Sequence, residues 1–316
     1  MKRGNIYFWY AAAVALMAIA GCTKTVHTPE NGEHSIGFNV QESVKAAVTG
    51  ANDIASFGVW GWYGSGEARD KNVFNGVEVH NQAGAWVYSN IQYWVPGMNY
   101  TFYAVYPFDY GECAPNGTVK VNDLDCSATG EDAVDLMTAE PVKGSGDSPQ
   151  NVLFTFSHEL SKLKFSFESS QTEVTVTNIK LYGISAGGSL TKTPDNATWS
   201  LATAATAENT LYSISQAALN AGNSYTAEPF GEILLPPHTD LADAKISFSY
   251  YYGENNANIK SADISLATGT GNVTSWEAGK SYGYTVAIPA EGKIKITVTV
   301  APWEERNASV TWTPNN

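Results

Sequence analysis

The stretch KIKITVTV at residues 293–300 decides the fold class, because apolar and polar residues alternate along all eight positions. Alternation with a period of two places the branched apolar residues on one face of an extended strand and the lysines and threonines on the other. At the usual rise per residue such a strand is about 27 Å long, which exceeds a typical strand. The apolar face comprises Ile294, Ile296, Val298 and Val300.

The same alternation recurs along the chain, in KLKFSFES (162–169), VTVTNIKLYG (174–183) and KISFSYYYG (245–253). Helical signals are few. Only SISQAALNAG (213–222) offers a serine at a helix start and Gly222 at a stop, so we expect one short helix there. Many strands separated by turns, with hardly a helix between them, predict an all-β chain built from antiparallel β-sandwiches.

A domain boundary is expected near residue 160. The polar loop VKGSGDSPQN (142–151) gives way there to the aromatic-rich segment LFTFSHELSKLKFSF, which could close one sandwich and open the next. This boundary predicts an N-terminal β-sandwich domain at 36–160 and a C-terminal one at 161–316. Without a 21-residue leader the chain keeps 316 − 21 = 295 residues, enough for two domains of about 100–200 residues each.

The N-terminus has the layout of a secretory signal peptide at residues 1–21. Two basic residues precede an uncharged run that is shorter than the roughly 20 residues of a transmembrane helix. The segment IAGC (19–22) resembles the bacterial lipobox, which predicts cleavage before Cys22 and attachment of acyl chains such as palmitate to that cysteine. More than one chain gives stable membrane retention. The alternative is an ordinary secretory signal that happens to end in a cysteine.

Residues 22–35 are polar, contain proline and glycine, and lack a hydrophobic period, so we expect a flexible tether. The chain carries a formal charge of −13, and loss of Lys2 and Arg3 makes it −13 − 2 = −15. Basic clusters are absent from the sequence, which disfavours binding to nucleic acid.

Two cysteines remain after Cys22, at positions 113 and 126. A secreted setting is oxidising, so we expect a disulfide between Cys113 and Cys126 that closes a short loop. Two buried thiols without a bridge are the alternative, since spacing alone does not decide pairing.

Sequence motifs for catalysis are missing. The chain has no phosphate-binding glycine loop, no HExxH or CxxC, and no GxSxG. The five histidines are scattered, and the acidic pairs near the two cysteines fit solvated loops better than a calcium site. We therefore expect no enzymatic activity, no metal and no cofactor.

Two aromatic segments allow opposite interpretations, VWGWYG (59–64) and YWVPGMNYTFYAVYP (93–107). Exposed Trp60 and Trp62 rings could stack on sugars, which would make the protein a glycan-binding lipoprotein that does not polymerise. Both faces of YTFYAVYP (100–107) are largely apolar, however, as in a strand that is covered on both sides. Core packing is the favoured interpretation.

The order of several short motifs resembles the fimbrillin family of Bacteroidetes, which includes type V pilins and their accessory subunits. The resemblance extends from about residue 36 to 303. It implies two transthyretin-like β-sandwich domains, no catalysis, and assembly into surface fimbriae that support adhesion and biofilm formation. The motifs are FGVWGWY (57–63), WVY (86–88), YTFYAVYP (100–107), DLM (135–137), VLFTFSHELSKLKFSF (152–167), GSL (188–190), EILLPP (232–237), WEAGKSYGYTVAI (276–288) and VAPWEE (300–305).

The resemblance also implies a route of assembly. A lipidated precursor reaches the cell outer membrane, and a trypsin-like protease cuts after a basic residue and removes the first strand. An extended segment of another subunit then fills the groove by strand exchange. The matching residue here is Lys45, with Ala46 as the new N-terminus and residues 36–40 as the strand that is lost.

The family more often carries arginine at this position, but Lys45 is the single Lys or Arg between Lys24 and Arg69. A solvated turn residue is the alternative role for Lys45. The candidate donor segments are the strand with Ile294, Ile296, Val298 and Val300, and the C-terminal tail with Val310 and Trp312. The expected partners are other fimbrial subunits, the outer membrane, and a host or bacterial surface receptor or glycan.

Overall fold

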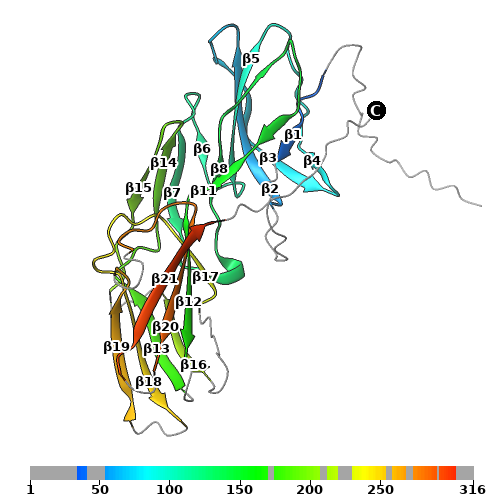
Figure 1. Ribbon diagram of the computed structural model, residues 1–316. Helices are drawn as coiled ribbons and strands as arrows, with labels where there is room; N and C mark the ends of the chain where they lie inside the picture. The colour runs from blue at the N-terminus through cyan, green and yellow to red at the C-terminus, as the bar shows by residue number, and fades with distance from the viewer. Residues whose placement is uncertain are drawn as a thin grey trace, which may run out of the picture. The chain divides into compact units, whose positions relative to one another are not determined.

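The computed structural model describes residues 34–40, 54–169, 174–206, 212–219, 230–253, 258–267, 273–289 and 292–303. These residues form strands β1 to β21 and one short 3-10 helix, η1 (Gly130–Asp132) (Figure 1). The predicted all-β class is confirmed. Within the described ranges, no helix has the length and apolar character needed to cross a bilayer.

The largest sheet has seven strands in the order β11-β8-β5-β2-β3-β4, with β9 paired to β5. Its central strand β5 is buried over almost its whole length, because apolar layers cover both faces of the sheet. The prediction that YTFYAVYP is covered on both sides is thus confirmed. The strands are β2 (Ser56–Gly64), β3 (Lys71–Gln82), β4 (Ala85–Val87), β5 (Asn99–Tyr106), β8 (Met137–Ala139), β9 (Val142–Ser145) and β11 (Phe156–His158).

One face of this sheet packs against a separate pair of strands, β1 (Phe38–Val40) and β10 (Val152–Phe154), around a first apolar cluster. Trp60 and Trp62 of β2 belong instead to a second cluster, which continues into the rest of the chain. Alternation along β2 places Phe57 and Val59 on one face and Trp60 and Trp62 on the other, so one strand contributes large side chains to both clusters.

A four-stranded sheet in the order β15-β14-β7-β6 contributes to the second cluster. The hairpin β14–β15 comes from beyond residue 160, yet β14 pairs with β7. The backbone pairing therefore crosses the predicted domain boundary, which stays a prediction. The strands are β6 (Glu112–Cys113), β7 (Val119–Asp125), β14 (Gly187–Thr193) and β15 (Asn196–Leu201).

The remaining eight strands form two four-stranded sheets that share a core, as a sandwich does. Phe167 and Phe248 meet edge to face across this core with ring centroids 5.1 Å apart. One sheet has the order β17 (Glu232–Leu235), β12 (Ser161–Glu168), β20 (Lys280–Ala287), β21 (Lys295–Pro302). The other has the order β16 (Tyr212–Leu219), β13 (Val174–Tyr182), β18 (Lys245–Tyr252), β19 (Lys260–Ser265).

Three expectations from the sequence are wrong in detail. The segment predicted as a helix at 213–222 contains strand β16, because its backbone pairs with β13 over seven positions and this pairing overrides local propensity. The sheets are not purely antiparallel, since β1 pairs with β10 and β12 with β20 in parallel. Order begins before Ile36, because Ser35 already forms a bridge with Tyr93.

Candidate strand-insertion site

Strand β1 occupies a slot in the first apolar cluster. Ile36, Phe38 and Val40 alternate along the segment and are exposed by only 1%, 0% and 5%. This is the segment that the sequence analysis expected to be removed by proteolysis. We define the β1 slot as the surroundings of these three side chains together with the backbone groups that flank the segment.

Phe38 lies at the centre of the β1 slot and contacts four aromatic rings. The ring centroids are 5.2 Å from Phe74, 5.5 Å from Tyr88, 6.2 Å from Phe102 and 5.9 Å from Phe154. Three of these contacts are edge to face, a favoured geometry for aromatic pairs. The slot therefore holds its central side chain by shape and by ring geometry.

Backbone hydrogen bonds reach the β1 segment from both sides. On one side β10 runs parallel to it, and the Val152 amide donates to the Gly37 carbonyl at 2.8 Å. On the other side the Ile36 amide donates to the Gln92 carbonyl at 2.8 Å, and the Trp94 amide donates to the His34 carbonyl at 2.9 Å. A segment in this position thus gains backbone bonds along both edges.

Tyr88 ties the wall of the slot to the β1 backbone. Its hydroxyl donates to the Ile36 carbonyl at 2.7 Å and accepts from the Gln92 amide at 3.2 Å. Burial raises the pKa of Tyr88 to about 12, so the hydroxyl keeps its proton at neutral pH and remains a donor. The slot therefore contains a fixed polar contact for the Ile36 carbonyl.

The slot can bind an extended segment with apolar residues at alternate positions. Burial of one such side chain contributes about 1.5–3 kcal/mol, so three contribute roughly 5–9 kcal/mol as an upper estimate. If β1 left, its apolar walls and the amide of Val152 would become accessible. Unpaired strand edges beside apolar surface are typical sites of strand addition in proteins.

Several residues predicted from the sequence lie outside the described part of the chain. They are Cys22, Lys45, Ala46, Val310 and Trp312. The other donor candidates lie on or beside β21, where Ile296 and Val298 are each 8% exposed and Val300 is 47% exposed. Ile294 packs against the second cluster just before β21 begins.

The predicted disulfide between Cys113 and Cys126 is wrong. Both residues are buried thiols that are not bridged to each other. Cys113 pairs with Val119 at the start of β7, whereas Cys126 follows the far end of that strand. Seven residues of strand separate the two positions by about 20 Å, and a disulfide requires Cα atoms within about 7 Å. Burial raises the pKa of both thiols to about 12.

The sugar-stacking interpretation of Trp60 and Trp62 is also wrong, because each is only 6% exposed. Trp62 packs edge to face against Tyr103 with centroids 5.9 Å apart. Neither ring presents a face to solvent on which a sugar could lie.

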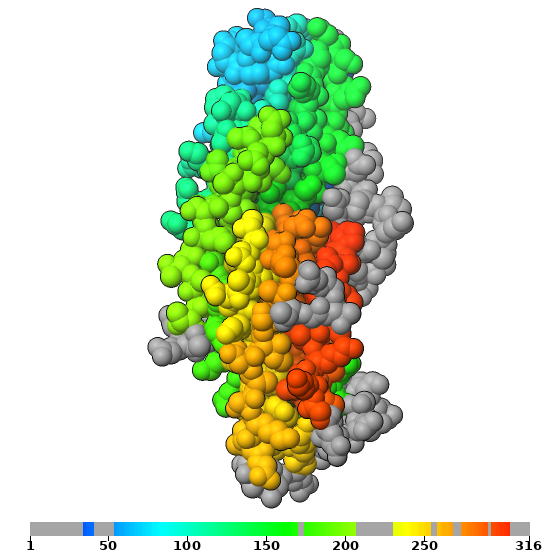
Figure 2. All heavy atoms as spheres, turned by 60° about the vertical axis from the view of Figure 1, so that its left-hand side comes forward, coloured from blue at the N-terminus to red at the C-terminus, as the bar shows by residue number. Residues whose placement is uncertain are grey.

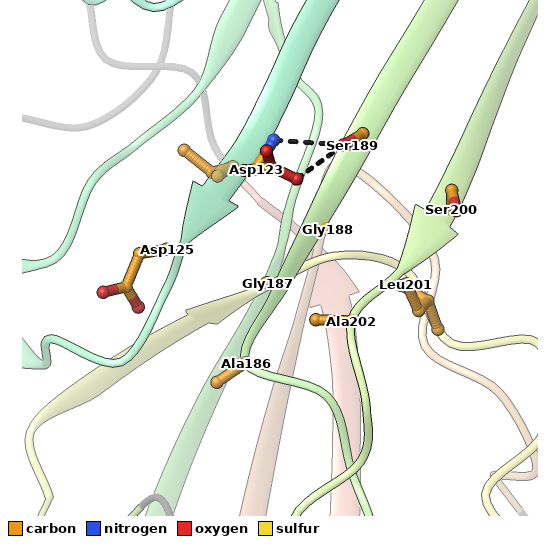
Figure 3. Close-up of a pocket in the computed structure, with 10 residues that line it drawn as sticks. Asp123, Asp125, Ala186, Gly187, Gly188, Ser189, Ser200, Leu201 and Ala202 are labelled. Carbon is orange, nitrogen blue, oxygen red and sulfur yellow. Dashed lines mark hydrogen bonds between the residues drawn. The ribbon is translucent and has the colours of Figure 1, made fainter.

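The acidic residues of β7 do not converge on a cation. A cavity of about 350 Å³ lies over Gly187 and Gly188 (Figure 3). At its edge the Asp123 carboxylate contacts the Ser189 hydroxyl at 3.4 Å, whereas Asp125 is turned away and accepts from the Ser127 amide. Across the described ranges, no three potential metal ligands come together.

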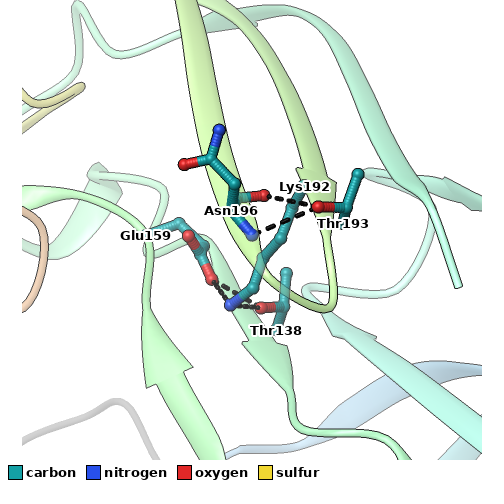
Figure 4. Close-up of polar contacts among 5 residues, drawn as sticks. All are labelled: Thr138, Glu159, Lys192, Thr193 and Asn196. Carbon is teal, nitrogen blue, oxygen red and sulfur yellow. Dashed lines mark hydrogen bonds and ion pairs between the residues drawn. The ribbon is translucent and has the colours of Figure 1, made fainter.

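A buried polar cluster fastens the hairpin β14–β15 to the strands beside it (Figure 4). The Lys192 ammonium on β14 donates to the Thr138 hydroxyl at 2.8 Å and forms an ion pair with Glu159, which is 3% exposed. Movement of Lys192 away from Glu159 would leave a buried charge without its partner, which is strongly destabilising. The ion pair therefore helps to fix the position of the hairpin.

Sequence reasoning identified the β1 segment but missed most of its surroundings. Tyr88 stands in the WVY motif, so a signal was present for one wall residue. No local pattern indicated that β10 would pair with β1 in parallel, because 111 residues lie between Val40 at the end of β1 and Val152 at the start of β10.

The chain matches a known protein family over most of its length. Residues 45–303 match a family model described as fimbrillin-like. A solved fimbrial protein from Bacteroides vulgatus is 17% identical with a TM-score of 0.57, covering 85% of this chain and 99% of that one. A proposed cell adhesion protein from Bacteroides uniformis is 17% identical with a TM-score of 0.54, covering 87% and 100%. At this identity the likenesses establish the fold. Among curated proteins no match was found.

Proposed function

The chain belongs to the fimbrillin-like family, and from that premise we propose that it is a non-catalytic subunit of cell-surface fimbriae in which an extended segment of another subunit replaces β1. The observation that carries the proposal is the β1 slot. Three alternating side chains are buried there, yet β1 belongs to a separate two-stranded sheet. Its loss breaks no pairing within the seven-stranded sheet that it covers.

Proteolysis after Lys45 is the step that frees the slot. Lys45 lies in the sequence between β1 and β2, so a cut after it separates β1 from the rest of the chain. The new N-terminus is Ala46. Release of β1 also removes the lipidated Cys22, which until then holds the precursor on the outer membrane.

The tail after Trp303 is a better donor than β21. β21 pairs with β20 at eight positions and buries Ile296 and Val298 in the core of its own molecule. Removing it would expose that core and open a sheet edge. The tail contains Val310 and Trp312 at alternate positions, which suits a strand that fills two neighbouring pockets.

Adhesion and biofilm formation follow from the assembly of such subunits on the cell surface. The fimbrial and cell adhesion descriptions of the similar structures support this role. We do not retain the glycan-binding alternative, because Trp60 and Trp62, which motivated it, are buried.

Limited trypsin treatment of the full chain tests the proposal. We expect Ala46 as the new N-terminus, followed by oligomers that resist separation during electrophoresis. Lys45→Gln is the control and should remain monomeric under the same treatment. Cleavage after Lys45 that leaves only monomers at high protein concentration would count against strand replacement, and resistance of Lys45 to cleavage would count against this maturation route.

A further inference from the structure

Thr138, Glu159 and Lys192 form a closed triangle of polar contacts (Figure 4). The Lys192 ammonium donates to the Glu159 Oε1 atom at 2.5 Å and to the Thr138 hydroxyl at 2.8 Å. The Thr138 hydroxyl in turn donates to the same carboxylate oxygen at 2.5 Å. An amine, a carboxyl group and a hydroxyl that can pass protons between them are therefore in direct contact.

The triangle is shielded from water. Thr138 and Glu159 are buried, and 20% of the Lys192 side chain is exposed. The hairpin β14–β15 that carries Lys192 forms part of the molecular surface (yellow-green in Figure 2). Burial removes the hydration that favours charged groups, so a neutral product of the two groups gains stability relative to the ion pair.

Three separate pieces of backbone hold the triangle in place. Thr138 lies within β8, which pairs with β5 and β11. The Glu159 amide donates to the Leu136 carbonyl at 2.9 Å. Lys192 lies within β14, between β7 and β15 in its sheet. Groups that a rigid frame holds in contact react far faster than free ones, because no entropy is lost in bringing them together.

We propose that Glu159 and Lys192 condense to form an isopeptide bond within the chain. One proton moves from the Lys192 ammonium through the Thr138 hydroxyl to Oε1, which leaves a neutral amine beside a protonated carboxyl group. The Nζ–Cδ bond then forms and the Cδ–Oε1 bond breaks. A second proton follows the same route, so that Oε1 leaves as water, and the third proton stays on the amide nitrogen. The ammonium and the carboxylate thus give one amide and one water without any further reactant.

The released water has room beside the reacting groups. A cavity of about 20 Å³ borders both Thr138 and Lys192, and this is about the space that one water molecule needs. The condensation therefore does not force the surrounding side chains apart.

The bond would join β14 to the connection between β11 and β12, across 33 positions of the chain. A covalent link of this kind constrains the unfolded chain as a disulfide does. Its formation requires no oxidation, which suits a chain whose two described cysteines are not bridged. A surface subunit would gain a tie that neither urea nor a reducing agent opens.

Tryptic mapping of the purified full chain, after denaturation and reduction, tests the proposal. Without the bond, trypsin releases residues 144–162 and 181–192 as separate peptides. With the bond, Lys192 is no longer a cleavage site, and residues 144–162 stay joined to residues 181–245. We expect the linked pair, with a mass lower than the sum of its two peptides by the mass of one water molecule.

Lys192→Arg should abolish the linked pair. It keeps a positive charge beside Glu159, but a guanidinium stays protonated and provides no free amine. Lys280→Arg is the matched control, because Lys280 also contacts a glutamate, Glu277, at 2.8 Å, but both side chains are largely exposed to water. The linked pair should persist in this control.

Thr138→Val should slow formation of the link at least about tenfold, because the proton relay is lost while the ion pair remains. The rate is followed by the same mapping from the moment at which unfolded, newly synthesised chain is diluted out of urea.

Separate peptides 144–162 and 181–192 from the full chain, with no linked pair, would overturn the isopeptide bond. A linked pair that persists in Lys192→Arg would also overturn it. If a variant does not fold, mapping of the unaltered chain still decides. Neither result bears on the replacement of β1, which is tested separately by cleavage after Lys45.

Discussion

The first and last strands of the described chain, β1 and β21, bury apolar residues at alternate positions but are integrated to different degrees. β1 has three residues and pairs with β10 in a separate two-stranded sheet. β21 has eight residues and pairs with β20 along all of them. Side-chain burial alone therefore does not distinguish the two strands. The extent of their backbone pairing does, with three pairs for β1 and eight for β21.

The two strands also differ in what lies beneath them. Phe38 enters a pocket of four rings that β1 does not help to build, since all four come from other strands or from the connection after β4. Ile296 and Val298 are part of the same cluster as the neighbouring residues of β20. Loss of β1 leaves an empty pocket, whereas loss of β21 leaves an incomplete core.

Truncation should give the largest contrast. A chain that ends at Gly292 lacks β21, so we expect loss of cooperative unfolding in urea, monitored by circular dichroism, because a core layer and eight backbone pairs are gone. A chain that ends at Trp303 should unfold like the full protein. Cooperative unfolding of the shorter chain at unchanged urea midpoint would contradict the proposed difference between the strands.

Phe38→Ala should have the next largest effect. We expect it to lower the free energy of unfolding by about 3–5 kcal/mol, because a fully buried ring is replaced by a cavity. Leu153→Ala is the control on the neighbouring strand, where the side chain is 46% exposed, and should change stability by less than about 0.5 kcal/mol. Similar losses in the two variants would mean that the pocket around Phe38 does not hold β1.

Val298→Ala should cost about 2 kcal/mol, because two buried methyl groups are removed from the core face of β21. Val300→Ala, two residues further on the same face, should cost about 0.5 kcal/mol or less since that side chain is 47% exposed. Chemical denaturation of both variants measures the difference. If Val300→Ala were the more harmful change, the burial gradient along β21 would not govern its attachment.

Acid should slightly weaken the packing around His238, next to the sheet of β21. Burial lowers the pKa of His238, whose Nε2 accepts from the Ser185 amide at 3.0 Å. Backbone bonds join His238 to Trp276, and the Trp276 indole donates to the Tyr284 hydroxyl on β20. Because the folded pKa is lower than the unfolded one, the stability from this group is present above about pH 6.5 and is lost as the pH falls.

His238→Gln should therefore reduce the fall in unfolding free energy between pH 7 and pH 5, an effect smaller than that of Val298→Ala. The measurement is urea denaturation of both proteins at a series of pH values. An unchanged pH dependence in the variant would mean that His238 does not contribute to acid sensitivity.

The alternating strands were predictable because a period of two is a local property of the sequence. KIKITVTV and KISFSYYYG correspond to β21 and β18 within a few residues. The strand at 212–219 was not predictable from local propensity, because its extended form depends on its pairing with β13. The prediction of a disulfide between Cys113 and Cys126 failed for a similar reason. The two cysteines are near each other in the sequence, but strand β7 holds them apart in space.

The candidate site was predictable only in part. The alternation of Ile36, Phe38 and Val40 marked a strand, and family resemblance suggested that it could be lost. The parallel partner β10 and the ring cage around Phe38 depend on contacts between residues far apart in sequence. Those contacts arise from the fold, so no local sequence pattern predicted them.

Hydrogen exchange at the Val152 amide reports directly on whether β1 can leave and be replaced, because this amide donates to the Gly37 carbonyl of β1. We expect protection in the intact chain, loss of protection after cleavage at Lys45 and removal of the β1 fragment, and recovery when a peptide of residues 34–45 is added. Amides between β2 and β5 should stay protected throughout. Loss of protection across the whole seven-stranded sheet when β1 leaves, or a Val152 amide that stays protected without any strand in the slot, would contradict a replaceable β1.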